Sequence, residues 1–355
     1  MPERTAAIIW IGINSVLVLT AVLIAAKEVV ARWPIENTPA ASLSIAGVAL
    51  ILNIDKVRSL LNLGQSDGLM LLAFACVLSW MERKPIWAGV AVGLSANIKY
   101  LSLIFVPYFL IKRNYRAVVA AVVSFGTFML LPAVEVGFTR GAEYISVATS
   151  GLGKMMGIKS SLAAADIFDV EWNRSVSITS TMFRLSRSHG WSDVVAVVGA
   201  LLLFTAVIAI IVLICRACGV AIFRPTNNEK SKSNAVAILE WVVLIFVALA
   251  FSPQTTSRHM VLMTLVYVVG VALLLIQSER TPRVLLICAT ALMVGALTLP
   301  PYGIGVDQVV WTWRKIGGAS WCALIFVLAL VWVGRRTISA KLHVDLGGRS
   351  DQTSP

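Results

Sequence analysis

The fold of this chain is decided by residues 62–116, which read NLGQSDGLMLLAFACVLSWMERKPIWAGVAVGLSANIKYLSLIFVPYFLIKRNYR. Short apolar runs in this stretch are interrupted by the polar residues Gly64-Gln65-Ser66-Asp67, by a basic turn at 82–84 and by a single Lys99. A helix of about 14 residues rises about 20 Å, whereas the hydrocarbon core of a bilayer is about 30 Å thick. We therefore expect short membrane helices, with Lys99 at or just under the outer boundary, where it needs an anionic partner or must reach toward water.

The whole chain has the composition of a multi-span membrane protein. Its 355 residues are 58% hydrophobic and 14% charged, and the mean hydropathy is +0.84. Lipid leaves no backbone group unpaired and the apolar segments lack strand alternation, so we predict an all-α polytopic membrane protein with about 10–11 transmembrane helices, several of them short. The expected spans are approximately 6–26, 39–54, 66–81, 85–98, 100–111, 115–134, 193–216, 235–251, 259–276, 283–299 and 318–334.

The net charge of +12 and the five cysteines exclude several classes of function. The basic residues sit mostly in loops between spans, where they set membrane topology, so we expect no nucleic-acid partner. All the cysteines lie in or beside apolar segments, which argues against a disulfide framework or a zinc site. Only Cys215-x-x-Cys218 has the spacing of metal ligands, and we interpret it as helix packing. The sequence thus predicts no metal and no cofactor.

The distribution of basic residues predicts the topology. With 82–84 and 112–116 placed in the cytoplasm by the positive-inside rule, the other loops follow by alternation. Residues 135–192 are too polar to span, so we expect them to form an exoplasmic loop or lid with interfacial helices. The predicted organisation has N-terminal membrane helices (1–134), this insertion (135–192), C-terminal membrane helices (193–336) and a disordered cytoplasmic tail (337–355).

Four polar clusters fall on the predicted exoplasmic side: 62–67, 97–99, 172–175 together with Arg184, and 252–259. A single cluster of this kind can simply mark a helix end, but four on one face favour a functional site. The clusters combine cations and amides with one carboxylate and one imidazole. Cations and amides suit an anionic headgroup, so a lipid phosphate or a lipid-linked sugar is the expected ligand.

The order of these motifs resembles the membrane glycosyltransferases of family 87. The resemblance is carried by Gly64-Gln65, Ala88-Gly89 with Lys99, a Pro107 helix ending in Lys112-Arg113, Asn173-x-Ser175 with Arg184, and Ser252-Pro253 with His259. It implies a GT-C type fold and a hexosyltransferase-like enzyme of the cell envelope. The implied donor is polyprenol-phosphate mannose or a related carrier of another hexose or pentose. The implied acceptor is a lipid or glycan at the exoplasmic face of a bacterial plasma (inner) membrane, with membrane lipids as further partners.

The chain departs from the family pattern at several positions. Arg174 stands where the family usually has Gln, and Thr255 and Thr256 stand where it has an aromatic residue. The family's first span and its first exoplasmic loop, which carries a catalytic Asp, are expected to be missing. A start site placed too late, a truncated gene, or an Asp recruited from elsewhere would each account for this. The recruited residue would be Asp67, with Asp55, Asp169 and Glu171 behind it.

The resemblance and the clusters together assign candidate roles. Asp67 and His259 are the predicted catalytic residues, although Asp67 also suits a helix N-terminus and His259 a helix cap. The predicted substrate-binding residues are Gln65, Asn97, Lys99, Asn173, Arg174, Arg184 and Arg258. Lys99 and Arg258 are expected to hold the lipid phosphate during inverting sugar transfer. The arginines at 174 and 184 are equally compatible with a solvated face, and Gln65 and Asn97 with interhelical hydrogen bonds.

Two other functions remain open at this point. A transporter or flippase of a lipid-linked or anionic solute would also use charged residues among broken helices. It would require polar residues through the middle of the spans, where only Glu240 is found. A non-catalytic, truncated family member is the other alternative.

Overall fold

The computed structural model describes residues 3–156, 168–225, 230–298 and 307–350. Within these ranges the chain is helical, and its only extended pairing is an isolated bridge between Ser175 and Thr256. The prediction of an all-α polytopic membrane protein is confirmed. The helices are α1 Glu3–Arg32, α2 Pro39–Leu52, α3 Ile54–Asn62, α4 Asp67–Trp80, α5 Pro85–Ile98, η1 Tyr100–Ile104, α6 Phe105–Ile111, α7 Tyr115–Val136, α8 Phe138–Met155, α9 Ile178–Ser188, α10 Asp193–Arg216, α11 Lys230–Ala250, η2 His259–Leu262, α12 Met263–Ile276, α13 Arg280–Thr298, α14 Asp307–Lys315 and α15 Gly318–Ser350.

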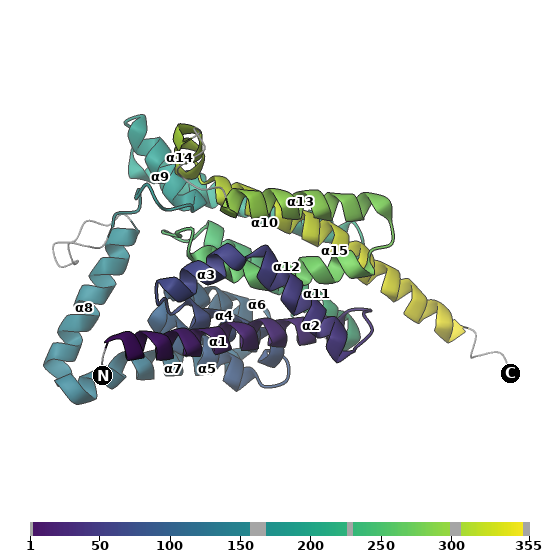
Figure 1. Ribbon diagram of the computed structural model, residues 1–355, viewed down its shortest axis with the longest axis horizontal. Coiled ribbons are helices and arrows are strands. Elements are labelled where there is room, and N and C mark those ends of the chain that lie inside the picture. The colour runs from purple at the N-terminus through teal and green to yellow at the C-terminus, as the bar shows by residue number, and fades with distance from the viewer. Residues whose placement is uncertain (1–2, 157–167, 226–229, 299–306, 351–355) are drawn as a thin grey trace.

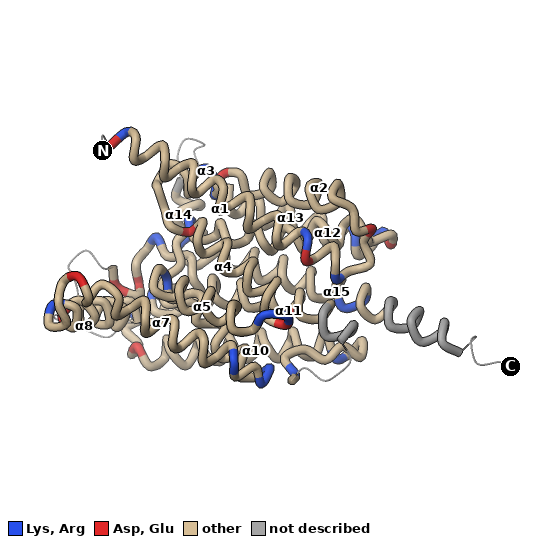
Figure 2. The backbone as a smooth tube through the Cα atoms, turned by 90° about the horizontal axis from the view of Figure 1, so that it is seen from below, with Lys and Arg blue, Asp and Glu red and all other residues tan. Residues whose placement is uncertain are grey.

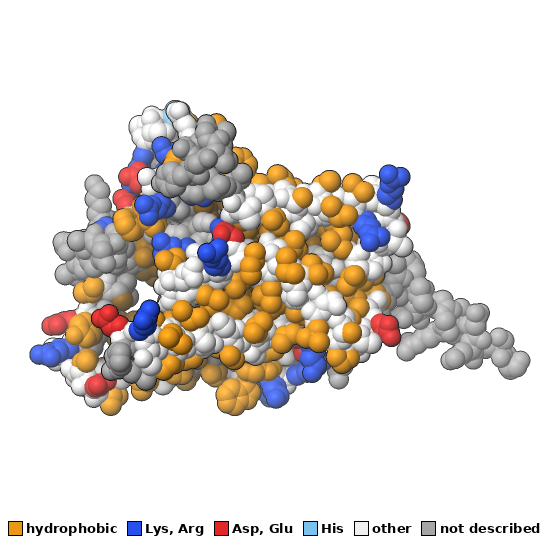
Figure 3. Space-filling model, viewed as in Figure 1, with side chains coloured by type: hydrophobic (Ala, Val, Ile, Leu, Met, Phe, Trp, Pro, Cys, Tyr) orange, Lys and Arg blue, Asp and Glu red, His pale blue; other side chains and the backbone are white. Residues whose placement is uncertain are grey.

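Most helices run along the long axis of one elongated bundle (Figure 1). By length and composition, six helices of the described residues can cross a membrane, or seven if the bent pair α2 and α3 forms one span. Four further apolar helices are shorter: Asp67–Trp80, Pro85–Ile98, Tyr100–Ile111 and Ala235–Ala250. All the predicted spans correspond to apolar helices of the structure, and the short ones are too short to cross a flat bilayer unaided, as expected. The helical tubes are largely uncharged (Figure 2), and hydrophobic side chains cover the flank seen in Figure 3.

The short helix α5 packs closely against α7 through two glycines. A Cβ atom on Gly89 would lie 2.2 Å from the Ala117 carbonyl oxygen, and one on Gly93 would lie 2.5 Å from the Ala121 carbonyl oxygen. Glycines four residues apart lie on one face of a helix and let two membrane helices approach closely. This contact fixes the position of α5, and Lys99 follows directly at its C-terminal end.

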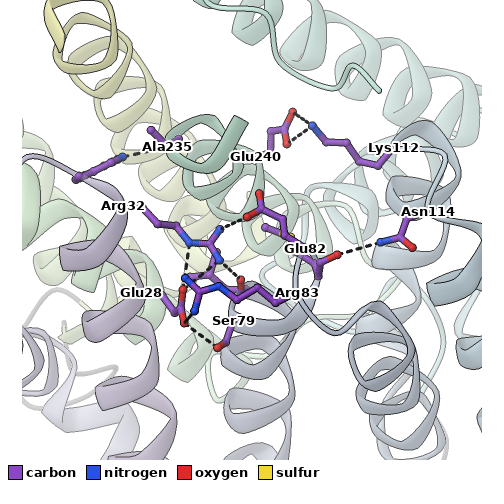
Figure 4. Close-up of polar contacts among 12 residues, drawn as sticks. Glu28, Arg32, Ser79, Glu82, Arg83, Lys112, Asn114, Ala235 and Glu240 are labelled. Carbon is purple, nitrogen blue, oxygen red and sulfur yellow. Dashed lines mark hydrogen bonds and ion pairs between the residues drawn. The ribbon is translucent and has the colours of Figure 1, made fainter. Parts of the chain in front are cut away.

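The end of the bundle remote from Lys99 contains a buried network of charges (Figure 4). Glu28 pairs with Arg32 at 3.1 Å and accepts a hydrogen bond from Ser79 at 2.8 Å. Beside them, Lys112 and Glu240 point toward each other with 2.8 Å between nitrogen and oxygen. These pairs join α1 to α4 and α6 to α11, and they lie at the end that the positive-inside rule places in the cytoplasm.

The predicted exoplasmic insertion contains two helices. The helix α8 stands apart from the bundle in Figure 1, whereas α9 packs on α10. Residues 157–167 of the insertion lie outside the described residues.

The helix α15 extends from Gly318 to Ser350, so it includes residues 337–350 of the predicted tail. Ile338 is buried and Arg335 donates a hydrogen bond to the Ile214 carbonyl, so packing carries the helix past the charged pair at 335–336. The last five residues lie outside the described ranges.

Candidate functional site

A cavity of about 470 Å³ lies where α4, α5 and η2 meet at the end opposite the charge network. Four of the predicted site residues line it, namely Gln65, Lys99, Arg258 and His259. They come from the loop before α4, from the C-terminal cap of α5 and from the segment that opens η2. Residues separated by up to about 190 positions in the sequence are thus brought to one site. The remaining lining is Ala96, Ile98, Tyr100, Leu101, Ala148, Gly151, Leu152, Met155, Trp172, Gln254 and Thr256.

Lys99 is held at the edge of this cavity by Asp67. The Lys99 Nζ atom lies 2.5 Å from Asp67 Oδ1; the Lys99 side chain is 20% exposed and that of Asp67 only 1%. Asp67 opens α4 and Lys99 caps α5, so the pair joins two helix ends. An ammonium group has three N–H donors, and one contact to Asp67 leaves the others for a ligand in the cavity. Asp67 itself does not line the cavity.

His259 presents a defined nitrogen to the cavity. The backbone N–H of Thr256 donates to His259 Nδ1 at 3.2 Å. Because Nδ1 accepts this hydrogen bond, the neutral ring carries its proton on Nε2, by the hydrogen-bonding pattern. His259 therefore offers a hydrogen-bond donor next to Lys99 and the exposed Arg258.

Buried serines join two of the predicted motifs into one wall of the site. Ser175 and Ser180 share a hydrogen bond of 2.8 Å between their hydroxyl groups, and Ser180 also donates to the Pro253 carbonyl at 2.8 Å. The backbone N–H of Val176 donates to the Thr255 carbonyl at 2.6 Å. Ser175 and Thr255 are both fully buried. The Asn-x-Ser and Ser-Pro motifs are thus adjacent because these hydroxyls pair with backbone groups, as buried polar groups require.

Arg184 supports this wall and does not line the cavity. Its guanidinium donates to the carbonyls of Trp172, Ser175 and Lys315 at 2.8, 3.1 and 2.8 Å. Burial lowers the pKa of Arg184 to about 10, and the negative charge of Glu171 opposes that shift. The five donors of a guanidinium fit such a set of backbone acceptors.

The other predicted residues lie outside the cavity lining. Asn97 donates to the carbonyls of Gly93 and Phe125 at 2.9 and 3.1 Å, so it joins α5 to α7. Asn173 and Arg174 are exposed on the surface beside Trp172. The sequence predicted on which side of the membrane these residues lie, but it did not predict toward which neighbouring helices their side chains point.

Three polar or aromatic residues of the site, Tyr100, Trp172 and Gln254, were given no role from the sequence, although Trp172 and Gln254 lie within the predicted polar clusters. Tyr100 shares a hydrogen bond of 2.8 Å with the Ser252 hydroxyl and donates to the Gln254 carbonyl at 3.2 Å. The side-chain amide of Gln254 donates to the Phe168 carbonyl at 2.6 Å, and Trp172 stacks on Phe168. Their adjacency to Lys99, Pro253 and Asn173 was a signal that could have found them. Nothing in the sequence indicated that α8 would line the opposite side.

A second, apolar cavity of about 480 Å³ adjoins the first. Tyr100 and Leu101 line both cavities. The apolar cavity continues between η1, α10 and α11 past Phe204, Val247 and Phe251. A donor-rich polar cavity and a groove fit for hydrocarbon therefore meet at the turn that follows Lys99.

The polar lining of the first cavity contains no carboxylate. Among the described residues, no three His, Cys, Asp or Glu side chains gather as they would to hold a metal ion. The arrangement is therefore suited to bind an anion through hydrogen-bond donors and one ammonium group.

The family model described as glycosyltransferase family 87 matches residues 1–253 of the 355-residue chain. No curated protein and no solved structure matches the chain.

Proposed function

Because that match covers more than half of its length, the chain belongs to glycosyltransferase family 87 and is a membrane glycosyltransferase, and we propose that it uses a polyprenol-phosphate sugar as donor. The sugar is mannose or another hexose or pentose, and the acceptor is a lipid or glycan. One observation carries the proposal: the donor-rich cavity and the apolar groove share Tyr100 and Leu101. A lipid phosphate likewise consists of a charged phosphate group, which would fit the donor-rich cavity, joined to a hydrocarbon chain, which would fit the apolar groove.

The polar cavity suits the phosphate of this donor. Lys99 and Arg258 supply positive charge, and His259 supplies the Nε2–H donor. As the acceptor oxygen bonds to the anomeric carbon, the bond between that carbon and the phosphate oxygen breaks, the electron pair stays on the phosphate oxygen, and the acceptor proton passes to the released lipid phosphate. Donors placed at such a developing charge typically contribute about 10²–10³ in rate each.

Asp67 is best assigned the role of positioning Lys99. Its Oδ1 atom already accepts from Lys99 Nζ, and its side chain is 1% exposed. A base that removes the proton of the acceptor hydroxyl must come within hydrogen-bond reach of it. The burial of Asp67 argues against that contact, so we propose that it orients the ammonium group of Lys99. This replaces the catalytic role expected for Asp67 from the sequence.

The apolar groove suits the polyprenyl chain. Its lining from Ile104 to Phe251 is almost entirely hydrophobic. Burial of hydrocarbon contributes about 25 cal/mol per Å² of apolar surface. We propose that the chain lies along this groove while the phosphate reaches Lys99 over Tyr100.

The reaction is proposed to take place at the exoplasmic face of a bacterial plasma (inner) membrane. The basic turns at 83–84 and 112–113 lie at the end of the bundle remote from Lys99. Basic loops tend to be retained in the cytoplasm, and this supports an exoplasmic position for the polar cavity.

The test uses the purified chain in nanodiscs with radiolabelled polyprenol-phosphate sugars and a membrane lipid extract as acceptor. We expect transfer by the wild type and a loss of at least about 100-fold in Lys99→Met. Arg174→Met is the matched control, since Arg174 is exposed outside the cavity, and should keep activity within about twofold. Undiminished transfer by Lys99→Met, or no transfer from any of the hexose and pentose carriers, would contradict the proposal.

A further inference from the structure

The apolar groove extends beyond the larger cavity toward the charged end of the bundle. A smaller cavity of about 160 Å³ shares Ile104, Phe204 and Val247 with it. Together they follow α10 from Val197 to Ile208, a rise of about 16 Å at about 1.5 Å per residue. The groove therefore runs inward from the polar cavity along a large part of the bundle.

Phe223 lies at the inner end of this path. It lines the smaller cavity together with Tyr108 and Ile111. Its ring meets the Tyr108 ring edge-on, with 6.4 Å between the ring centroids. Phe223 has a backbone φ of +54°, a conformation that bulky residues adopt only when their surroundings enforce it.

The enforcing contact is the buried carboxylate of Glu240. The backbone N–H of Phe223 donates to Glu240 Oε1, and the Tyr108 hydroxyl donates to Oε2 at 2.9 Å. Lys112 Nζ lies 2.8 Å from the same carboxylate (Figure 4). Glu240 is fully buried, so each of these donors is needed to compensate its desolvation. The position of Phe223 is therefore fixed by one charged centre that also holds α6 against α11.

We propose that Phe223 closes the groove and sets the length of hydrocarbon chain that it holds. The inference rests on the proposed function, because the occupant is the polyprenyl chain of the lipid phosphate. The continuity of the groove with the cavity at Lys99 supports this occupant over a bilayer phospholipid. Isoprenoid units that lie within the groove increase the binding affinity, whereas units that would extend beyond Phe223 do not change it.

Binding of sugar-free polyprenyl phosphates tests this, using a series that differs by single isoprene units and protein in nanodiscs. For the wild type we expect affinity to rise with chain length and then to stay constant. In Phe223→Ala the affinity should keep rising for at least one more isoprene unit before it becomes constant. The first added unit should tighten binding about tenfold. Phe223→Trp should move the start of the plateau to a shorter chain.

Phe204→Ala is the matched control, because Phe204 lines the middle of the groove. It should weaken binding of all chains that pass it without moving the plateau. The same plateau in the wild type and in both Phe223 variants would overturn the role of Phe223 while leaving the proposed donor intact. Failure of every polyprenyl phosphate to bind, or equal displacement by phosphatidylglycerol, would overturn the proposed function itself.

Discussion

The glycine contact between α5 and α7 makes a prediction that is independent of substrate. In Gly93→Ala the new Cβ atom would lie 1.9 Å from Ser124 Oγ, 2.5 Å from the Ala121 carbonyl oxygen and 2.7 Å from the Phe125 nitrogen. The serine hydroxyl can rotate away, but the two backbone atoms can move only with α7. Ordinary contact would require the helices to separate by about 1 Å, and overpacking of this kind destabilises by about 1–3 kcal/mol.

The matched control is Gly126→Ala in α7, where no heavy atom lies within 4 Å of the added Cβ. Replacing a helical glycine by alanine without a clash stabilises by about 0.5–1 kcal/mol. Both positions are helical and share this gain, so the unfolding free energies of the two variants should differ by the overpacking cost of about 1–3 kcal/mol. Reversible SDS titration of the purified protein, followed by tryptophan fluorescence, measures this difference. Equal stability of Gly93→Ala and Gly126→Ala would refute the close-packing argument.

Three further predictions concern the cavity and its wall. Lys99→Met leaves Asp67 buried without its partner, so its unfolding free energy in SDS titration should fall by about 3–5 kcal/mol. The double variant Asp67→Asn/Lys99→Met should recover most of this stability but no transfer activity; transfer by the double variant would show that Lys99 does not act in the site. Arg184→Lys should be destabilised by at least about 2 kcal/mol in the same titration, because one ammonium group cannot reach the separated carbonyls, and wild-type stability would show that these hydrogen bonds are unimportant. Tyr100→Phe should lose about 1 kcal/mol of unfolding free energy, because its hydrogen bond to Ser252 is removed, and should bind polyprenyl phosphate more weakly in the nanodisc assay. Unchanged affinity would show that Tyr100 does not contact the ligand where the two cavities meet.

Much of the fold follows from the sequence, because hydropathy locates apolar helices directly. The predicted spans at 85–98, 193–216 and 259–276 coincide with helical segments of the structure. The short helices were expected as well, because the lengths of the apolar runs are read directly from the sequence. The helix α15 extends beyond the predicted span end at 334 to Ser350, and a tertiary contact such as that of Arg335 with the Ile214 carbonyl is not reported by hydropathy.

The site was predictable only in part, for a physical reason. Charge distribution and alternation predict the side of the membrane on which a residue lies, and on that basis Gln65, Lys99 and His259 were expected at one end of the bundle, where they line one cavity. They do not indicate the direction around the bundle, so Asn97 and Arg174 were included although they face elsewhere. Contacts between residues far apart in sequence, such as Lys112 with Glu240, leave no local signal.

The placement of the Asp67 and Lys99 pair at two helix ends has an energetic consequence. Asp67 stands in the first turn of α4 and Lys99 caps the C-terminus of α5. Each charge is therefore stabilised by the dipole of its own helix, by about 0.3–1 kcal/mol, whether or not the pair is closed. These terms offset only part of the cost of leaving the buried Asp67 unpaired, so the ion pair holds the Lys99 ammonium group at the edge of the cavity whether or not the cavity is occupied.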